Sequence, residues 1–179
     1  FCNGRAVGMD DAFGRVGYPA ATAIGHHDPQ RGLIVYWLAA VHNGQRVENP
    51  RQVSAWCYPH SYGPTPPGFA RALRLPNNLG LAISGTAAVV GHASTHPSHM
   101  AAQLQEIFTN LDHLHEAAGY SDRLPVDSLL KVYVRHPQDA SAVAEAIRQR
   151  YGPTLPNLIL QGDICRRELL VEIDGWHLR

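Results

Sequence analysis

The sequence has little charge and no excess of either sign. Asp, Glu, Lys and Arg together make up 17% of the residues, with 15 basic against 15 acidic side chains. A neutral chain has no general attraction to nucleic acid or to an anionic membrane, so neither is expected as a partner. Any anion binding must then depend on a few well-placed arginines. The hydrophobic share of 45% is typical of an ordinary folded protein.

Cysteine is also scarce. The chain has only Cys2, Cys57 and Cys165, an odd number without a CxxC pair. A disulfide framework or a zinc knuckle is therefore not expected, and the reducing cytoplasm is the expected location. No apolar run reaches the roughly 20 residues that a membrane-spanning helix needs, and no secretory leader is recognised. The first residue is Phe1, and we expect the chain to be the remainder of a longer one.

The histidines raise the question of a metal site, because the chain has 11 of them. His92, His96 and His99 have spacings that would place ligands near the start of a helix. However, no carboxylate completes a pattern such as HExxH. We therefore expect no metal ion and no other cofactor. A metal-dependent hydrolase is the least favoured of the functions considered below.

Apolar periodicity predicts a sheet and two helices. The run from Leu33 to Val41 is continuously apolar, β-branched and aromatic, which predicts a buried strand. Helices are predicted from Pro97 to Gly119 and from Pro137 to Gly152, where apolar residues recur three and four positions apart. Further strands are expected at 79–90, 129–135, 158–165 and 169–173, the last two joined as a hairpin. This order predicts an α+β fold with both helices on one face of the sheet, and no internal repeat is apparent.

Four strings within residues 79–175 resemble the RidA (YjgF) superfamily. They are ISGTAAVVGH at 83–92, AAGYS at 117–121, LLKVYVRH at 129–136 and LLVEID at 169–174. The resemblance implies a RidA-like, chorismate-mutase-like sheet with two helices packed on one face, preceded by an N-terminal accessory segment. Such a match indicates the fold better than the function, because one fold hosts several activities.

Two further segments resemble one family within this superfamily, the chorismatases. VENPRQVSAWCYPHSYGPTPPGFARA at 47–72 is similar to their signature loop, and QGDICRRELLVEI at 161–173 is close to their form. Chorismatases have a two-part chain whose C-terminal part is RidA-like. The resemblance implies that residues 1–75 are the remainder of the N-terminal part with the proline-rich loop, and that 76–179 are the RidA-like catalytic domain. It also implies a homotrimer or a pseudo-trimer.

The resemblance implies an enzyme that converts chorismate to pyruvate and 3-hydroxybenzoate, with 4-hydroxybenzoate as a further product. Such an enzyme protonates the enolpyruvyl group, holds two carboxylates with cations and needs no cofactor. Two alternatives stay open. One is a chorismate hydrolase that forms a dihydrodiol, and the other is a non-catalytic RidA-like protein that binds a small carboxylate.

Glu172 is the candidate catalytic acid. It matches the glutamate that the family uses near its C-terminus, and a carboxyl flanked by aliphatic residues in LLVEI should have a raised pKa. Cys165, seven positions earlier, resembles the members that form hydroxybenzoates, whereas dihydrodiol-forming members tend to have alanine there. A cysteine at this position would restrict water and favour attack by the ring hydroxyl.

Two arginines are expected to bind the substrate carboxylates. Arg135 ends a predicted strand and Arg71 follows the proline-rich loop, while Arg166 is a weaker candidate. Loop tyrosines, small residues and one amide complete the expected substrate site: Tyr58, Tyr62, Gly85, Thr86, Ala87 and Gln161. Gln161 and Cys165 are expected on a strand that pairs with the strand of Glu172.

Overall fold

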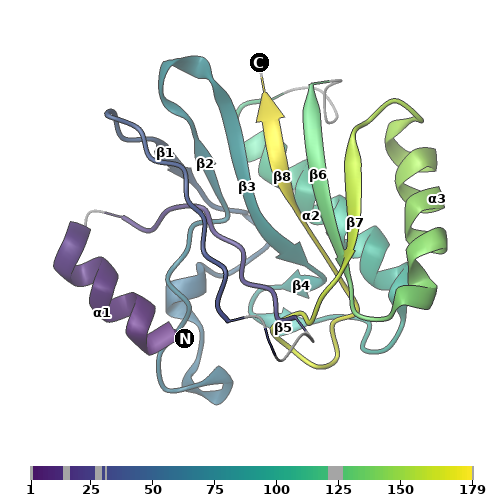
Figure 1. The fold of residues 1–179 in the computed structure, drawn as a ribbon, viewed down its shortest axis with the longest axis horizontal. Helices are drawn as coiled ribbons and strands as arrows, with labels where there is room; N and C mark the ends of the chain where they lie inside the picture. The colour runs from purple at the N-terminus through teal and green to yellow at the C-terminus, as the bar shows by residue number, and fades with distance from the viewer. Residues whose placement is uncertain (1, 14–16, 27–29, 31, 121–126, 179) are drawn as a thin grey trace.

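A six-stranded sheet forms the centre of the computed structural model, which describes residues 2–13, 17–26, 30, 32–120 and 127–178 (Figure 1). Its strands, in spatial order, are β1 (Gln45–Val47), β2 (Ala72–Arg74), β3 (Gly80–Ala87), β8 (Val171–Leu178), β6 (Ser128–Val134) and β7 (Asn157–Gln161). Neighbours are antiparallel except for β6 and β7. A small second sheet pairs β4 (Val89–Val90) with β5 (Ala93–Ser94).

The helices α2 (Met100–Ala117) and α3 (Ala140–Tyr151) lie on the same face of this sheet. The buried residues Val132, Val171 and Ile173 point from the sheet toward Ile107 of α2 and Ile147 of α3, and together they form one core. Because side chains alternate along a strand, Glu172 and Asp174 of β8 point to the opposite face. The predicted α+β fold with two helices on one face is confirmed.

The N-terminal part adds a helix that the sequence did not indicate. Residues Cys2–Phe13 form α1, which lies at the far end of the molecule from α3 (Figure 1). After it, residues 17–26 cross the sheet face that the two other helices leave open, as the hydrogen bond between Gly85 N–H and Thr22 Oγ1 shows. Among the described residues, the remaining helical elements are short 3-10 turns: Ala55–Cys57, His60–Tyr62, Pro76–Asn78 and Pro137–Asp139.

Two strand predictions are wrong. Residues 33–41 pair with no strand among the described residues, and their apolar side chains are exposed, with Trp37 at 80%. The predicted hairpin is also absent, because β7 pairs in parallel with β6, while β8 lies between β3 and β6. The physical reason for the second error is the connection β6–α3–β7, a crossover that places two parallel strands side by side and leaves β8 to enter from the other side of β6.

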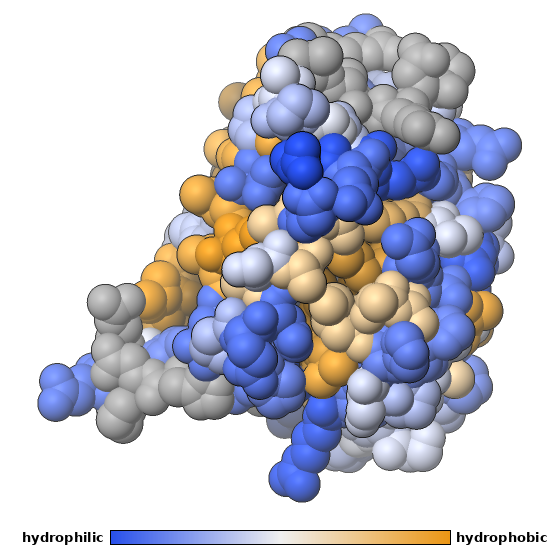
Figure 2. Space-filling view, turned by 90° about the vertical axis from the view of Figure 1, so that its right-hand side faces the viewer, coloured by the Kyte–Doolittle hydropathy of each residue, from blue (hydrophilic) through white to orange (hydrophobic). Residues whose placement is uncertain are grey.

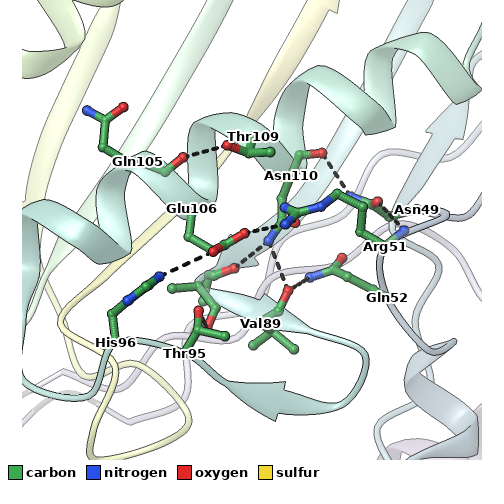
Figure 3. A network of polar contacts seen from close by, with 12 residues as sticks. Asn49, Arg51, Gln52, Val89, Thr95, His96, Gln105, Glu106, Thr109 and Asn110 are labelled. Carbon is green, nitrogen blue, oxygen red and sulfur yellow. Dashed lines mark hydrogen bonds and ion pairs between the residues drawn. The ribbon is translucent and has the colours of Figure 1, made fainter.

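A polar network fastens the start of the proline-rich loop to α2 (Figure 3). Arg51 reaches Glu106 at 2.6 Å and donates to Asn110 Oδ1 at 2.6 Å, while Asn49 Nδ2 donates to the Asn110 carbonyl at 2.8 Å. The buried Asn110 amide in turn donates to the carbonyl of Val89. These paired buried groups give the loop one defined position on the helix, although it has almost no regular structure of its own.

Candidate active site

Glu172 lies near the start of β8, directly after Val171, and it pairs with residues of both neighbouring strands, β3 and β6. Its side chain is buried, with the residue 6% exposed, and it stands opposite Tyr133 of β6 and Ala87 of β3. Burial raises the pKa of this carboxyl to about 8, and the nearby charge of Asp174 acts in the same direction, against the opposing charge of Arg71. The carboxyl therefore holds its proton at neutral pH, as the sequence predicted.

The neighbouring strand is shaped to accommodate this carboxyl. The pairing of β3 with β8 shifts register between Ile83 and Thr86, which is a bulge beside Glu172. A Cβ added to Gly85 would lie 2.0 Å from Glu172 Oε1 and 3.1 Å from the Thr22 methyl carbon. Gly85 N–H also donates to Thr22 Oγ1 at 2.9 Å. Only a glycine at position 85 leaves room for the Glu172 carboxyl. Thr22, from the N-terminal segment, packs against the same glycine.

Arg71 brings a buried positive charge to the same place. Its residue is 5% exposed, its Nη2 donates to Tyr58 OH at 2.6 Å and to the Val53 carbonyl at 2.9 Å, and its charge is near enough to lower the pKa of Glu172. The guanidinium also lies 5.1 Å from the ring centre of Phe69. Its Nε–H is buried and has no hydrogen-bond partner among the described residues. A buried, unpaired donor on a cation is suited to receive an anionic group.

Arg166 supplies a second cation beside the loop tyrosines. Its guanidinium carbon lies 3.9 Å from the centre of the Tyr62 ring and 5.2 Å from that of Tyr58, and its Nη1 donates to Ser94 Oγ at 3.0 Å. Tyr62 OH lies 3.2 Å from His92 Nδ1. Tyr58 thus stands between the two arginines, because Arg71 also lies 5.5 Å from its ring centre. Two cations and two phenols gather at one place from segments distant in sequence.

The Arg135 side chain forms its hydrogen bonds with other groups of the protein, which the sequence did not indicate. Its side chain donates to the carbonyls of Leu169, Ile164 and Arg166, and it forms an ion pair with Asp163 at 2.6 Å. These contacts fasten the loop between β7 and β8. The loop carries Cys165 and Arg166, so Arg135 positions site residues through the backbone.

Cys165 lies in that loop rather than on a strand. The surrounding protein raises the pKa of the thiol to about 11, and the negative charge of Glu172 contributes to the rise. The thiol is therefore neutral near pH 7 and is a weak nucleophile. Its closeness to the acid agrees with a role in shaping the reaction space.

The structure brings together most, but not all, of the predicted site residues. Glu172, Arg71, Tyr58 and Gly85 meet as described, together with Cys165 and Tyr62, and Ala87 pairs directly with Glu172. Thr86 instead pairs with Ile173, whose side chain lies in the core, so it lies on the other sheet face. Gln161 does not join them. It pairs with Val134, whose side chain lies in the core, so the register places Gln161 on the opposite sheet face from Glu172.

Sequence reasoning missed Thr22, Phe69 and Glu48 and underrated Arg166. Thr22 comes from a segment without periodicity, and Phe69 from the middle of the proline-rich loop. Glu48 accepts the backbone N–H of Arg71 at 3.4 Å, and burial raises its pKa. Only Arg166 had a signal in the sequence, namely its place next to Cys165.

Two of the histidines proposed as metal ligands instead make local contacts at the start of α2. His99 Nδ1 accepts the N–H of Ala102 at the start of α2, and His96 lies 3.3 Å from Glu106. Over the described part of the chain, no group of three or more His, Cys, Asp or Glu side chains is arranged to hold a metal ion. Within the same residues, no helix combines the length and the apolar character needed to cross a membrane.

Comparison with known proteins supports the resemblance seen in the sequence. No family model matches the chain. A 3-hydroxybenzoate synthase of Streptomyces hygroscopicus is 37% identical over 193 residues, an alignment that covers 98% of this chain and 55% of that protein. A chorismatase of Streptomyces rapamycinicus is 38% identical and is covered to 56%. A chorismatase crystal structure superposes with a TM-score of 0.80 at 32% identity over 99% of this chain. Along almost its entire length, this chain is related to the chorismatases.

More distant structures share the fold alone. The YjgF gene product of E. coli gives a TM-score of 0.53 at 19% identity and covers 75% of this chain. A Rid-family protein of Yersinia pestis gives 0.56 at 14% identity. The expected RidA-like fold is thereby confirmed. This chain spans a little over half the length of the chorismatases that it matches, 56% in the case of the crystal structure.

Proposed function

We propose that this chain carries the acid and the anion-binding residues of a chorismatase that converts chorismate to pyruvate and 3-hydroxybenzoate. The observation that carries the proposal is the buried carboxyl of Glu172, protonated at neutral pH beside a guanidinium whose Nε–H is unpaired. The names of the related proteins, 3-hydroxybenzoate synthase and chorismatase, support the same reaction.

In the proposed reaction, Glu172 donates its proton to the methylene carbon of the enol ether. The resulting oxocarbenium ion makes the enolpyruvyl group a good leaving group, and a buried acid with a pKa of about 8 suits this step near neutrality. Arg71 is proposed to bind one carboxylate of the substrate through its unpaired Nε–H, and Arg166 to attract the other. The phenols of Tyr58 and Tyr62 would then face the substrate.

Cys165 is proposed to determine which product forms, the hydroxybenzoate or the dihydrodiol. Attack by the ring hydroxyl on the carbon that bears the ether breaks the carbon–oxygen bond and releases pyruvate without consuming water. Ring opening and loss of a ring proton then leave the hydroxybenzoate, so that the two products contain all the atoms of chorismate. The neutral thiol, near enough to Glu172 for that carboxylate's charge to raise its pKa, is proposed to keep water from attacking this carbon. With water as the nucleophile, the product would instead be a dihydrodiol.

The test is incubation of the purified protein with chorismate, with pyruvate measured by a coupled assay and the aromatic product by mass spectrometry. We expect equal amounts of pyruvate and 3-hydroxybenzoate from the parent protein, and both products at a rate lower by roughly 10²- to 10⁴-fold from Glu172→Gln. Glu116→Gln is the matched control, because the Glu116 side chain is 81% exposed on α2. Cys165→Ala should shift product toward the dihydrodiol, which is heavier by one water molecule.

The alternatives give different results in the same assay. A chorismate hydrolase would form the dihydrodiol before any substitution. A non-catalytic binding protein would retain chorismate in equilibrium dialysis without releasing pyruvate, and Glu172→Gln would leave that binding nearly unchanged. Activity that EDTA abolishes would indicate the metal-dependent hydrolase.

We further propose that the protein works in the cytoplasm as a homotrimer or a pseudo-trimer. The RidA-like fold supports this assembly, because it leaves one sheet face free of helices. Sedimentation equilibrium measures the mass of the assembly directly. A mass three times that of one chain supports the homotrimer, and a longer chain that sediments with the mass of a single chain supports the pseudo-trimer.

A further inference from the structure

The small hairpin of β4 and β5 contacts two side chains of the candidate site. Ser94 Oγ accepts a hydrogen bond from Arg166 Nη1 at 3.0 Å. His92, in the turn between the two strands, has its Nδ1 3.2 Å from Tyr62 OH. Because the Arg166 guanidinium carbon lies 3.9 Å from the centre of the Tyr62 ring, these side chains form a ring of contacts that the hairpin backbone closes. The hairpin therefore holds a cation and a phenol of the site relative to each other.

The Ser94 hydroxyl connects the Arg166 cation to a carboxylate. It donates to Glu168 Oε1 at 2.7 Å while it accepts from Arg166, so one hydroxyl serves as donor and acceptor at once. The hydrogen bond from Ser94 is the main cause that lowers the pKa of Glu168, and the charge of Arg166 acts in the same direction. The Glu168 carboxylate is thus ionised near pH 7. Hydrogen bonds with a charged partner are stronger than those between neutral groups, so Ser94 is held firmly on both sides.

A buried amide of α2 fixes the backbone around Glu168. The Gln103 residue is 0% exposed, and its Nε2 donates to the carbonyls of Glu168 at 2.8 Å and His96 at 3.0 Å. Its Oε1 accepts the N–H of Leu170 at 2.8 Å. Rotation of this side chain would leave buried polar groups unpaired, which is costly. The carboxylate that contacts Ser94 therefore lies on a rigid part of the loop between β7 and β8.

The Arg166 guanidinium keeps donors for a ligand. Its Nη1 donates to Ser94, whereas its Nε and Nη2 donate to no group among the described residues. The contact with Tyr62 is made to the π-electrons of the ring and needs no N–H donor. A planar guanidinium with two nitrogens available can bind a carboxylate through two parallel hydrogen bonds. Because Ser94 fixes one nitrogen, it also determines the direction in which the other two point.

We propose that Ser94 and Glu168 are positioning residues that orient Arg166 toward one carboxylate of an aromatic dicarboxylate ligand. This inference rests on the proposed function, in which Arg166 attracts one substrate carboxylate. Arg71 supplies the second cation, and the ring of Tyr58 stands between the two arginines. Binding of a ligand with two carboxylates then depends on Ser94, whereas a ligand whose single carboxylate binds at Arg71 does not need it. The pair thereby selects among small carboxylates.

Steady-state kinetics of the purified full-length protein with chorismate test the proposal. Ser94→Ala should raise KM roughly tenfold and change kcat by less than about twofold, because the hydroxyl orients a binding group and takes no part in proton transfer. Ser94→Thr keeps the hydroxyl and should restore KM. In the Arg166→Met background, Ser94→Ala should cause no further loss, since its effect passes through the arginine. An unchanged KM in Ser94→Ala, or additive effects of the two substitutions, would overturn the proposal.

A second variant and two matched controls accompany this series. Glu168→Gln should raise KM about as much as Ser94→Ala does. Its control is Glu145→Gln on α3, where the side chain is 46% exposed. That helix lies on the side of the molecule that faces the viewer in Figure 2, where much of the surface is hydrophilic. Thr109→Ala, which removes an exposed hydroxyl bonded to the Gln105 carbonyl, is the control for Ser94→Ala. Both controls should keep the parent KM.

Titration calorimetry separates this proposal from the proposed reaction, because it needs no turnover. With isophthalate, an aromatic dicarboxylate, Ser94→Ala should raise Kd roughly tenfold, and with benzoate it should leave Kd unchanged. If the parent protein released no pyruvate and this difference persisted, the proposed reaction would be wrong and the positioning role would stand. Equal losses for both ligands, or no loss for either, would contradict the positioning role even in a protein that releases pyruvate.

Discussion

At the scale of single residues, the proposed chemistry depends on one carboxyl whose environment favours its neutral form. Glu172 is buried on the open face of the sheet, with Asp174 two positions away on the same face and Arg71 nearby. Burial and the negative charge of Asp174 raise the pKa of Glu172, and the positive charge of Arg71 lowers it. Burial has the largest effect, so the protonated form is favoured. A group of this kind can protonate a carbon atom at a pH where an ordinary glutamate has no proton to give.

The pH dependence of turnover follows from this pKa. Glu172 must be protonated to act as the acid, so kcat should stay level below about pH 8 and fall tenfold per unit above it. Glu172→Gln should lower kcat by roughly 10²- to 10⁴-fold, and the descending limb near pH 8 should be absent from its residual activity. The measurement is a pH series of steady-state rates. A descending limb that persists unchanged in Glu172→Gln would assign the titration to another group.

Gly85 provides a second test at this scale. The side chain of Gly85→Ala would come within 2.0 Å of Glu172 Oε1, so the carboxyl must move from its place. We expect kcat to fall by about 10²-fold, because displacement of a reacting group by about 1 Å is enough for such a loss. Gly32→Ala is the control, since an added Cβ there meets nothing within 4 Å. Unchanged kcat in a folded Gly85→Ala protein would show that the carboxyl position is not critical.

At the scale of elements, loops carry the tyrosines, Cys165 and Arg166 of the candidate site, and polar contacts hold these loops in place. The network of Arg51, Glu106 and Asn110 fixes the start of the loop that carries Tyr58 and Tyr62 (Figure 3). Arg135 fixes the loop that carries Cys165. The sheet provides a rigid base in both cases, and the loops approach it from opposite ends of the sequence.

Arg135 is therefore expected to act through the loop that it holds. Arg135→Met removes hydrogen bonds to three carbonyls and the ion pair with Asp163, and should lower kcat by roughly tenfold to a hundredfold. It should also raise amide exchange across residues 162–170, a readout that loss of a direct substrate contact would not change. Arg148→Met is the control, because that side chain is 59% exposed and pairs only with Glu145 among the described contacts. If KM alone rises and exchange stays the same, Arg135 binds substrate instead.

At the scale of the whole molecule, the buried acid makes folding depend on pH. The pKa of Glu172 is about 8 in the folded protein against an ordinary value of 4.5, so protonation favours the folded state. The stability that this group contributes is complete below about pH 4.5 and is lost as the pH rises through 8. Urea unfolding of the parent protein should thus show a fall in stability over this range relative to Glu172→Gln. Parallel curves for the two proteins would mean that Glu172 titrates normally.

Much of the fold and part of the site could be predicted from the sequence. Helices with regular apolar spacing, the strands β3 and β6 and the burial of Glu172 were predicted correctly, because local periodicity and the LLVEI string report on burial directly. Gln161 and the hairpin could not be placed correctly, since a strand's partners depend on the crossover through α3 rather than on the strand's own residues. The contacts of Arg135 with three carbonyls and of Arg166 with the tyrosine rings could not be predicted for a similar reason: sequence identifies a cation, but not the groups that surround it.

The sequence by itself determined that this chain is related to the chorismatases, and it identified the acid and the cations that are candidates for proton transfer and anion binding. Composition and short strings are enough for this, because they reflect side-chain chemistry and local burial. Only the tertiary structure decided that Thr22 and Gly85 enclose Glu172 and that the apolar segment 33–41 lies exposed. Both facts depend on contacts between segments far apart in the chain, and the free energy of such contacts is set by topology rather than by local sequence.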